Sequence, residues 1–261
     1  MNYVEAYYAQ YDEDARFLRK SHETEYLTTM HYIQKYLFSG ARILEIGAGT
    51  GRYSCALAKQ GYSVDAVELL PKHIEILKRK SKNNSNLHIY KGDAVDLDFI
   101  DSDTYDIVLL LGPMYHLFSE GDKSKALAEA IRAAKPNGII FAAYCNNDTT
   151  VYNLFLQRQI AEFQKSNTFT ENFQIKPLPE LVFAFSRKTD IDCLMRKFPV
   201  HRLHFVGTDM LSEFFCDAID DFSDSEFSLY MQYHFQICER ADCVGMSFHF
   251  LDVFQKDCNN L

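Results

Sequence analysis

Short apolar runs alternate with amphipathic segments along the chain from residue 41 onward. Five of the runs are predicted to be strands, at residues 41–46, 62–69, 86–91, 105–111 and 138–145. Helices are predicted between them: one has Pro71 in its first turn, and another, residues 122–135, ends in the turn sequence Pro136-Asn137-Gly138. This alternation is typical of an α/β fold, in which helices cover both faces of a mostly parallel sheet.

The alternation stops after the fifth strand and returns near residue 202. Two more strands are predicted at residues 202–207 and 247–256, with a helix at about 225–239 between them. The phenylalanine-rich stretch 146–200 is therefore predicted to be an insertion. Its position suits a cap over an acceptor site, and its aromatic content also fits a dimer surface.

The first 40 residues are predicted to be helical. Tyr26, Met30, Ile33 and Leu37 are spaced to form one buried stripe. Tyrosines 3, 7 and 11 also recur every four residues, which suits either the inner face of a lid or simple docking onto the core. We expect a single domain over residues 1–261, with residues 1–40 as a helical lid segment.

Composition and charge narrow the function classes. Of 261 residues, 47% are hydrophobic and 24% are charged, as in ordinary globular proteins. No apolar stretch approaches the roughly 18 residues of a membrane span, and the chain starts without a signal sequence, so we expect a cytoplasmic protein with no membrane partner. The formal charge of −9 disfavours a nucleic-acid partner. The seven cysteines include no CxxC pair, which favours reduced thiols over a metal site.

The sequence ILEIGAGTGRY, residues 43–53, places a glycine turn between a strand and a helix. Such a turn presents bare backbone N–H groups and a helix N-terminus to a ligand. The glycines are Gly47, Gly49 and Gly51, and the sixth position is Arg52. Because dinucleotide-binding turns carry a third glycine at that position, a nicotinamide-dependent oxidoreductase is the weaker alternative.

Acidic residues follow the next two strands. Glu68 ends the second strand, where a carboxylate can accept hydrogen bonds from both hydroxyls of a ribose. Asp93 follows the third strand in the sequence KGDA, within reach of an adenine amino group. Glu45 lies two residues before the first glycine. These positions favour an adenosine group held between the two strand ends.

In these motifs, together with the sequence YDIVLLLGPMYHL, the chain resembles the class I S-adenosylmethionine-dependent methyltransferases. The resemblance covers residues 41–145 closely. It implies a Rossmann-like seven-stranded sheet of order 3-2-1-4-5-7-6 with strand 7 antiparallel. It also implies that the glycine turn holds the methionine half of S-adenosyl-L-methionine, that Glu68 holds the ribose, and that Asp93 and Ala94 hold the adenine. The product would be S-adenosyl-L-homocysteine. The full cofactor-binding set that we predict is Glu45, Gly47, Ala48, Gly49, Gly51, Arg52, Glu68, Leu69, Gly92, Asp93, Ala94, Leu111, Gly112 and Tyr11.

Arg52 is an unusual residue for the first turn of a helix, since the helix dipole disfavours a cation there by about 0.3–1 kcal/mol. A bound carboxylate would compensate. We therefore expect Arg52 to receive the carboxylate of the cofactor, with an exposed surface arginine as the alternative.

The fourth strand ends in LGPMYHLF, residues 111–118, where a methyl acceptor would enter. His116 is the expected general base and Tyr115 is expected to orient the acceptor, although both could simply pack beside the strand. The Asn-Pro-Pro-aromatic motif of amino-directed nucleic-acid methyltransferases is absent, which favours a small-molecule acceptor. We expect a monomer or homodimer. A protein that binds S-adenosylmethionine without turnover remains a further alternative.

Overall fold

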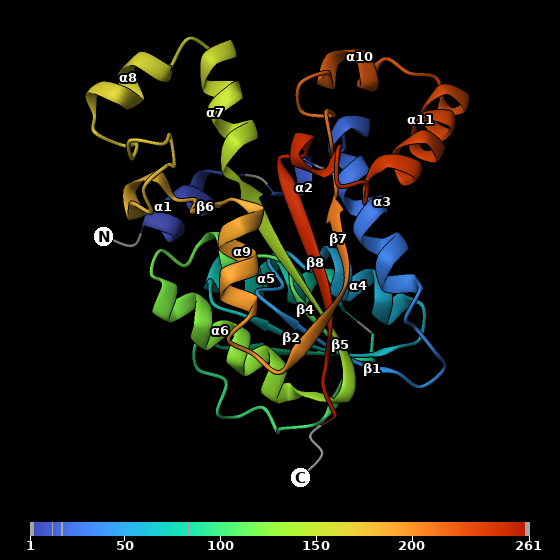
Figure 1. Cartoon of the computed structure of the whole chain (residues 1–261). Helices are drawn as coiled ribbons and strands as arrows, with labels where there is room; N and C mark the ends of the chain where they lie inside the picture. The colour runs from blue at the N-terminus through green and yellow to red at the C-terminus, as the bar shows by residue number, and fades with distance from the viewer. Residues whose placement is uncertain (1–2, 12, 17, 83, 259–261) are drawn as a thin grey trace.

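The computed structural model describes residues 3–11, 13–16, 18–82 and 84–258. Its strands form one sheet of order β3-β2-β1-β4-β5-β8-β7, with short β6 paired beside β5 (Figure 1). Strand β8 is antiparallel to both of its neighbours, and the other named pairs are parallel. The predicted order is confirmed, with β7 and β8 as the predicted sixth and seventh strands. The strands are β1 (Arg42–Ile46), β2 (Ser63–Glu68), β3 (Leu87–Lys91), β4 (Tyr105–Leu110), β5 (Ala134–Asn146), β6 (Phe185–Ser186), β7 (Val200–Gly207) and β8 (His249–Lys256).

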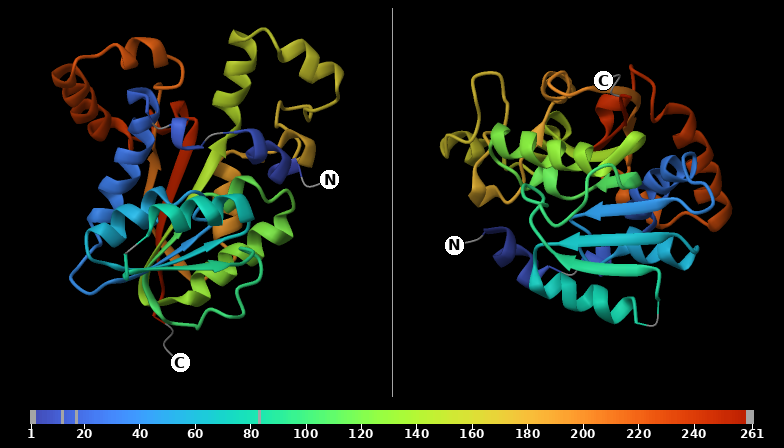
Figure 2. Two further views of the ribbon diagram at one scale, coloured as in Figure 1. Left: turned by 180° about the vertical axis from the view of Figure 1, so that it is seen from behind. Right: turned by 90° about the horizontal axis from the view of Figure 1, so that it is seen from below.

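Helices pack on both faces of the sheet (Figure 2). Successive residues of a strand point to opposite faces, and in β1 this sends Leu44 into one apolar cluster and Ile43 into another. The first cluster contains Leu127 of α6, and the second contains Leu57 of α4 and Ile33 of α3. Because both faces are covered, the central strands are continuous apolar runs. The covering helices are α4 (Arg52–Lys59), α5 (Pro71–Lys80) and α6 (Glu120–Ala133).

Strand β5 begins earlier than the predicted residue 138. Ala134 already pairs with Tyr105, and the register then shifts before Ile107 pairs with Ile139. Asn137 has φ 62°, so the sequence Pro136-Asn137-Gly138 forms a bulge inside the strand and does not end the helix as a separate turn.

The N-terminal region is helical, as predicted. It contains α1 (Tyr3–Gln10), α2 (Glu13–Arg16) and α3 (Lys20–Gln34). Met30 and Ile33 of the predicted stripe are buried, Tyr26 is partly buried, and Leu37 lies beyond the helix end but still packs on the core. The Lys72 Nζ donates to the backbone carbonyls of Tyr8 at 2.7 Å and Ala9 at 3.0 Å, which fastens α1 to α5.

Two excursions leave the sheet at the end where β5 finishes. Residues 146–200 form one of them, with a small apolar cluster around Val151, Leu154 and Ile175. In Figure 1 its first two helices rise on one side and the helices between β7 and β8 rise on the other. The first excursion contains α7 (Asn147–Leu156), α8 (Ile160–Lys165), η2 (Pro179–Leu181), β6 and α9 (Lys188–Met195). The second contains α10 (Cys216–Asp220), α11 (Asp224–Ile237) and η3 (Val244–Met246).

The seven cysteines are all free thiols. Within the described ranges, none of the helices combines the length and the apolar character that crossing a membrane requires.

Candidate active site

A cavity of about 350 Å³ lies at the carboxyl ends of β1, β2 and β4. Ligands of open α/β sheets bind at this edge. The cavity is lined by Val4, Tyr8, Glu25, Thr29, Glu45, Gly47, Ala48, Gly49, Thr50, Arg52, Tyr53, Glu68, Leu69, Leu70, His73, Gly92, Asp93, Ala94, Leu111, Gly112, Pro113, Tyr115, His116, Leu117, Phe118, Ala143, Thr208 and His249. All the predicted site residues except Gly51 and Tyr11 are therefore gathered around one cavity.

The glycine turn follows β1 directly. Gly47 and Ala48 donate their N–H groups to the Val67 carbonyl at 2.8 and 3.0 Å, which ties the turn to β2. Gly49 has φ 56°, and a Cβ added there would meet no atom within 4 Å. The turn therefore leaves open space over Gly49, where a ligand can approach the backbone.

Glu68 is hydrogen-bonded to the glycine turn. Its Oε2 accepts a hydrogen bond from the Gly49 N–H at 2.7 Å, and its Oε1 accepts one from the Leu70 N–H at 2.8 Å. His73 Nδ1 lies 3.6 Å from Oε1. Burial by itself would raise the pKa of Glu68, but His73 and the two N–H groups outweigh it, and the pKa is lowered. The carboxylate is therefore ionised and fixed in orientation.

Glu45 lines the cavity but serves mainly to begin α4. Its Oε2 accepts the Ser54 N–H at 2.9 Å and also the Ser54 hydroxyl. The side chain is 2% exposed, and burial raises its pKa to about 8. Glu45 is thus largely protonated at neutral pH, and its hydrogen bonds with Ser54 hold the start of α4 next to the glycine turn.

This raised pKa makes the stability dependent on pH. An unfolded glutamate releases its proton near pH 4.5, whereas the folded one keeps it to about pH 8. Between these two pH values the native state binds more protons than the unfolded state. The stabilisation that protonated Glu45 provides is therefore lost as the pH rises from 4.5 to 8. We expect Glu45→Gln to gain stability relative to wild type over this window, by about 3 to 5 kcal/mol. Denaturant unfolding from pH 5 to 9 measures it. Glu180 is exposed, so the control variant Glu180→Gln should differ from wild type in its free energy of unfolding by the same amount at every pH. If the free energies of Glu45→Gln and wild type instead changed in parallel with pH, this account of Glu45 would be contradicted.

The remaining predicted cofactor residues extend along the cavity wall. Asp93 follows β3, and its Oδ1 accepts the Val95 N–H at 3.2 Å. Leu111 and Gly112 follow β4. Leu69, Gly92 and Ala94 complete the part of the wall between β2 and β3.

Arg52 is the first residue of α4 and lines the cavity. Its guanidinium carbon lies 4.0 Å from the centre of the Tyr26 ring, a cation–π contact that fixes the side chain. No acidic residue lies in the first turn of α4. The side chain lies on the side of the cavity formed by α3 and α4, and its charge also contributes to the lowered pKa of Asp14.

His116 connects the N-terminal helix to the insertion. Its Nε2 lies 3.0 Å from the Tyr8 hydroxyl and its Nδ1 lies 2.9 Å from the Val182 carbonyl. The carbonyl can only accept, so Nδ1 carries the proton and the Tyr8 hydroxyl donates to Nε2. Burial lowers the pKa of His116, which keeps the ring neutral. Both nitrogens of the expected general base are occupied in this arrangement.

Tyr115 lies beside His116 and faces the same cavity. The Ala184 N–H donates to its carbonyl at 2.8 Å, and the Phe183 ring lies 6.1 Å from the Tyr115 ring. Residues 182–184 of the insertion thus pack directly against the segment that was predicted to face the acceptor.

Two predicted site residues lie outside the lining. Gly51 is the N-cap of α4 with φ 85°, and a Cβ added there would lie 2.0 Å from the Leu77 Cδ1. It lets α4 pack closely on α5 and does not face the ligand. Tyr11 stacks on Tyr7 at 5.1 Å. Val4 and Tyr8 face the cavity instead, so the structure shifts the expected inner face of α1 by one residue.

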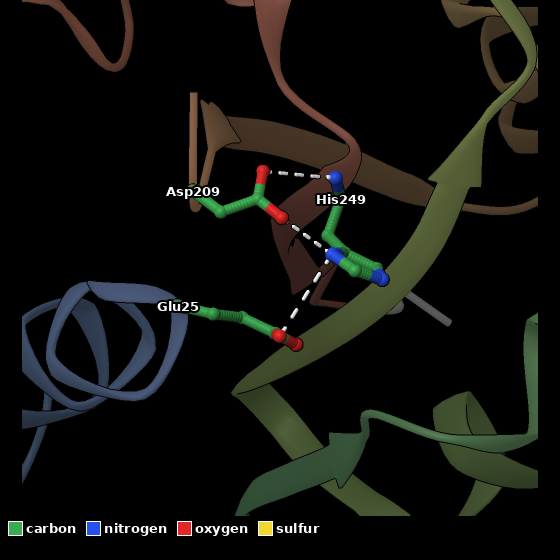
Figure 3. Close-up of side chains that lie close together, drawn as sticks. All are labelled: Glu25, Asp209 and His249. Atoms are coloured by element: carbon green, nitrogen blue, oxygen red, sulfur yellow. Dashed lines mark hydrogen bonds and ion pairs between the residues drawn. The ribbon is translucent and has the colours of Figure 1, made fainter. Parts of the chain in front are cut away.

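The sequence did not indicate a cluster at the other end of the cavity. Glu25, Asp209 and His249 place one ligand-type atom each within 4.8 Å of one another. His249 Nδ1 lies 2.6 Å from Asp209 and 3.8 Å from Glu25 (Figure 3). Among the residues that the structure describes, these are the side chains whose ligand atoms lie close enough together to bind one metal ion. Residue spacing could not reveal it, because 40 positions of chain separate the aspartate from the histidine.

Comparison with known proteins identifies the class. Residues 43–138 match a family model described as a methyltransferase domain. The chain is 33% identical to a glycine/sarcosine N-methyltransferase of Parasynechococcus marenigrum, over 42% of this chain and 40% of the relative. It is 34% identical to a demethylmenaquinone methyltransferase of Clavibacter sepedonicus, over 39% and 40%. These alignments therefore span about two fifths of the relatives' length.

Solved structures share the fold over the whole chain. A possible histamine N-methyltransferase of Thermotoga maritima superposes with a TM-score of 0.59 at 18% identity, covering 98% of this chain and 99% of that one. A methyltransferase solved with the Trm112 activator of Haloferax volcanii gives 0.62 at 17% identity, covering 99% of both chains. Residues 43–138 thus match a methyltransferase domain, and the chain shares the fold of solved S-adenosylmethionine-dependent methyltransferases. The match to a methyltransferase domain favours S-adenosylmethionine as the cofactor over the nicotinamide alternative.

Proposed function

We propose that the protein is a cytoplasmic methyltransferase that transfers the methyl group of S-adenosylmethionine to a small-molecule acceptor. The observation that carries this proposal is one cavity that unites the glycine turn, the carboxylates after β2 and β3, and the segment after β4. When bound, the cofactor supplies an electrophilic methyl group. The chain has to hold it, position the acceptor in line, and exclude water.

The cofactor contacts follow from the hydrogen-bonding capacity of each group. The Glu68 carboxylate has about four acceptor sites, and Gly49 and Leu70 occupy two of them. His73 Nδ1 also lies 3.6 Å from Oε1, so the ribose hydroxyls are assigned to the remaining acceptor capacity of this carboxylate. We assign Asp93 and Ala94 to the adenine and the backbone of residues 47–49 to the methionine half. Leu69, Gly92, Leu111 and Gly112 line the path between them, and Glu45 supports the turn.

Arg52 is assigned to the cofactor carboxylate, and this assignment predicts a ligand-specific loss. Removing one charge-assisted contact costs about 1.5–3 kcal/mol, so Arg52→Ala should weaken S-adenosylmethionine binding by roughly 10- to 100-fold. Methylthioadenosine, which lacks the carboxylate, should bind the variant and the wild type equally. Calorimetric titration measures both ligands. Equal losses for the two ligands, or no loss for either, would contradict the assignment.

The acceptor side of the cavity is assigned to Tyr115, the N-terminal helices and the insertion. We propose that residues 1–40 form a lid and residues 146–200 a cap over the acceptor. The support is the hydrogen bond of His116 with Tyr8 on one side and with Val182 on the other. His116 acts as a base only when it releases the Tyr8 hydroxyl. In the arrangement described it fastens the lid.

A small acceptor is supported by the relatives and by charge. The names of similar proteins specify glycine and sarcosine, demethylmenaquinone, and an O-methylation step of ubiquinone biosynthesis. These acceptors differ in the atom that is methylated, so they indicate the size of the acceptor and leave its atom open. The formal charge of −9 argues against nucleic acid. Monomer or homodimer remains a prediction.

Formation of S-adenosylhomocysteine is the test of turnover. One relative, 34% identical over 38% of this chain, is named an S-adenosyl-L-methionine-dependent Diels-Alderase. Binding of the cofactor therefore does not by itself establish methyl transfer. We expect the purified protein to release S-adenosylhomocysteine with at least one compound from a panel of small amines, phenols, thiols and quinols. Tight binding without release from any compound would favour a non-methylating protein.

A further inference from the structure

The cluster of Glu25, Asp209 and His249 borders the cavity that also contains the glycine turn. Glu25 is on α3, Asp209 follows β7, and His249 begins β8. His249 pairs with Cys145 near the carboxyl end of β5, at the same edge of the sheet as the glycine turn. Glu25 and His249 line the cavity, together with Ala143 of β5 and Thr208.

Asp209 is held in one orientation by four donors. It is 1% exposed. Its Oδ1 accepts the N–H groups of Phe248 at 2.9 Å and His249 at 3.1 Å, and the Ser247 hydroxyl at 2.5 Å. Its Oδ2 faces His249 Nδ1 at 2.6 Å. Burial alone would raise the pKa of Asp209, but His249 and these donors outweigh it, and the pKa is lowered. An ionised Asp209 keeps the proton on His249 Nδ1.

The other ring nitrogen of His249 is directed elsewhere. Figure 3 shows Nε2 pointing away from both carboxylates. The side chain is 19% exposed, so Nε2 is the nitrogen that can meet a ligand in the cavity. His116, by contrast, uses both of its nitrogens on Tyr8 and Val182.

We propose that His249, positioned by Asp209, is the catalytic group that takes the proton from the methyl acceptor. The inference rests on the proposed function. It specifies an acceptor whose attacking atom carries a dissociable proton, as in a hydroxyl or an ammonium group. Loss of this proton leaves the attacking atom with the electron pair that bonds to the methyl carbon, while the carbon–sulfur bond breaks and its electron pair stays on sulfur. The acceptor proton moves to Nε2 and then leaves to solvent.

The charges around His249 determine the pH at which it can act. Glu25 faces it from α3, Asp209 from the turn after β7, and Cys145 from β5. Burial alone would lower the pKa of His249, but the two carboxylates outweigh it, and the pKa stands well above 6.5. Proton acceptance therefore increases as the pH rises above neutrality. A base of raised pKa is also better matched to hydroxyl and ammonium protons.

A metal ion is the competing occupant of the cluster. Metal–ligand distances are roughly 2.0–2.2 Å, which sets two ligands of one ion about 3 Å or more apart. The 2.6 Å between Nδ1 and Oδ2 is the distance of a shared proton. The geometry favours the ion pair, and chelation tests this directly.

The first experiment compares His249→Gln with His201→Gln. His201 forms an exposed pair with Asp257 at 2.9 Å on β7, which makes it a matched histidine–aspartate control. Turnover of hydroxyl and amine compounds is followed by S-adenosylhomocysteine release from pH 6 to 10. We expect kcat/KM of wild type to rise with pH, His249→Gln to lose about 100-fold or more, and His201→Gln to match wild type. The affinity of His249→Gln for S-adenosylmethionine should stay within about threefold.

The outcomes separate the two levels of the proposal. A loss under threefold in His249→Gln, abolition of turnover by EDTA, or cofactor binding with no turnover of any hydroxyl or amine compound would overturn the role of His249. Absence of cofactor binding would overturn the proposed function itself. Turnover of hydroxyl compounds alone or amine compounds alone would support the role of His249 and identify the acceptor class.

A second readout needs no acceptor. Nitrogen-15 NMR of histidine in the ligand-free protein should show the proton fixed on Nδ1 of His249 and titration at Nε2. The pKa should fall in Asp209→Asn, because the variant removes the charge that stabilises the imidazolium. Titration at Nδ1, or an unchanged pKa in Asp209→Asn, would overturn the positioning role of Asp209.

Discussion

Replacing Glu68 with glutamine should weaken the binding of S-adenosylmethionine by about 100-fold or more. The carboxylate now accepts the N–H groups of Gly49 and Leu70 and lies beside His73, and its remaining acceptor capacity is assigned to the ribose. A glutamine side chain has one oxygen, so it must turn an amide N–H toward one of these donors. Charge-assisted hydrogen bonds contribute about 1.5–3 kcal/mol each, and two of them account for the expected loss. Calorimetric titration at pH 7 measures it.

A matched control separates this loss from a change in total charge. Glu75 lies on α5, seven residues further along, and is exposed. Glu75→Gln should bind the cofactor like wild type. Circular dichroism should show that both variants retain the fold. An affinity of Glu68→Gln within threefold of wild type would remove Glu68 from the cofactor site.

Replacing Gly51 with alanine should destabilise the protein by about 2–5 kcal/mol. The residue has φ 85°, where a side chain costs about 1–2 kcal/mol. A Cβ there would also lie 2.0 Å from the Leu77 Cδ1 and 3.2 Å from the Cys55 Sγ. Because Leu77 is fully buried, it has little room to move, and overpacking of this kind costs about 1–3 kcal/mol more. Chemical denaturation measures the free energy of unfolding.

Gly61 provides the control for backbone strain. It has φ 95°, and an added Cβ would meet no atom within 4 Å, so Gly61→Ala should cost only about 1–2 kcal/mol. Leu77→Ala tests the contact itself, since it should cost less in the Gly51→Ala background than in wild type. Equal costs for Gly51→Ala and Gly61→Ala would show that α4 and α5 do not pack as described.

The alternating α/β pattern and most residues of the main cavity could be predicted because their signals are local, whereas the strand order was implied by the resemblance to a known family. The apolar runs of the first four strands, the glycine turn, and the acidic residues Glu68 and Asp93 lie within residues 41–112, and parallel strands bring their carboxyl ends to one edge. The role of Gly51 could not be predicted, because nothing near it in the sequence shows that Leu77 packs against it. Strand β5 began early because its pairing with Tyr105 overrides the turn-forming residues at its start.

Contacts between distant segments account for the remaining differences. The tyrosine stripe at residues 3, 7 and 11 lies one residue away from the face of α1 that meets the cavity. The contacts that hold α1 join distant segments, as in the hydrogen bonds of Lys72 to the carbonyls of Tyr8 and Ala9. Asp209 and His249 meet across the antiparallel pair of β7 and β8, where Gly207 opposes Phe250. Periodicity within one segment gives no sign of either arrangement.

The most direct test of the central claim is a pair of calorimetric titrations of the wild-type protein, one with S-adenosylmethionine and one with NADH. The structure predicts micromolar binding of S-adenosylmethionine at one site per chain and no binding of NADH. Binding of NADH, or of neither ligand, would contradict the assignment of the glycine turn, Glu68 and Asp93 to a single S-adenosylmethionine site.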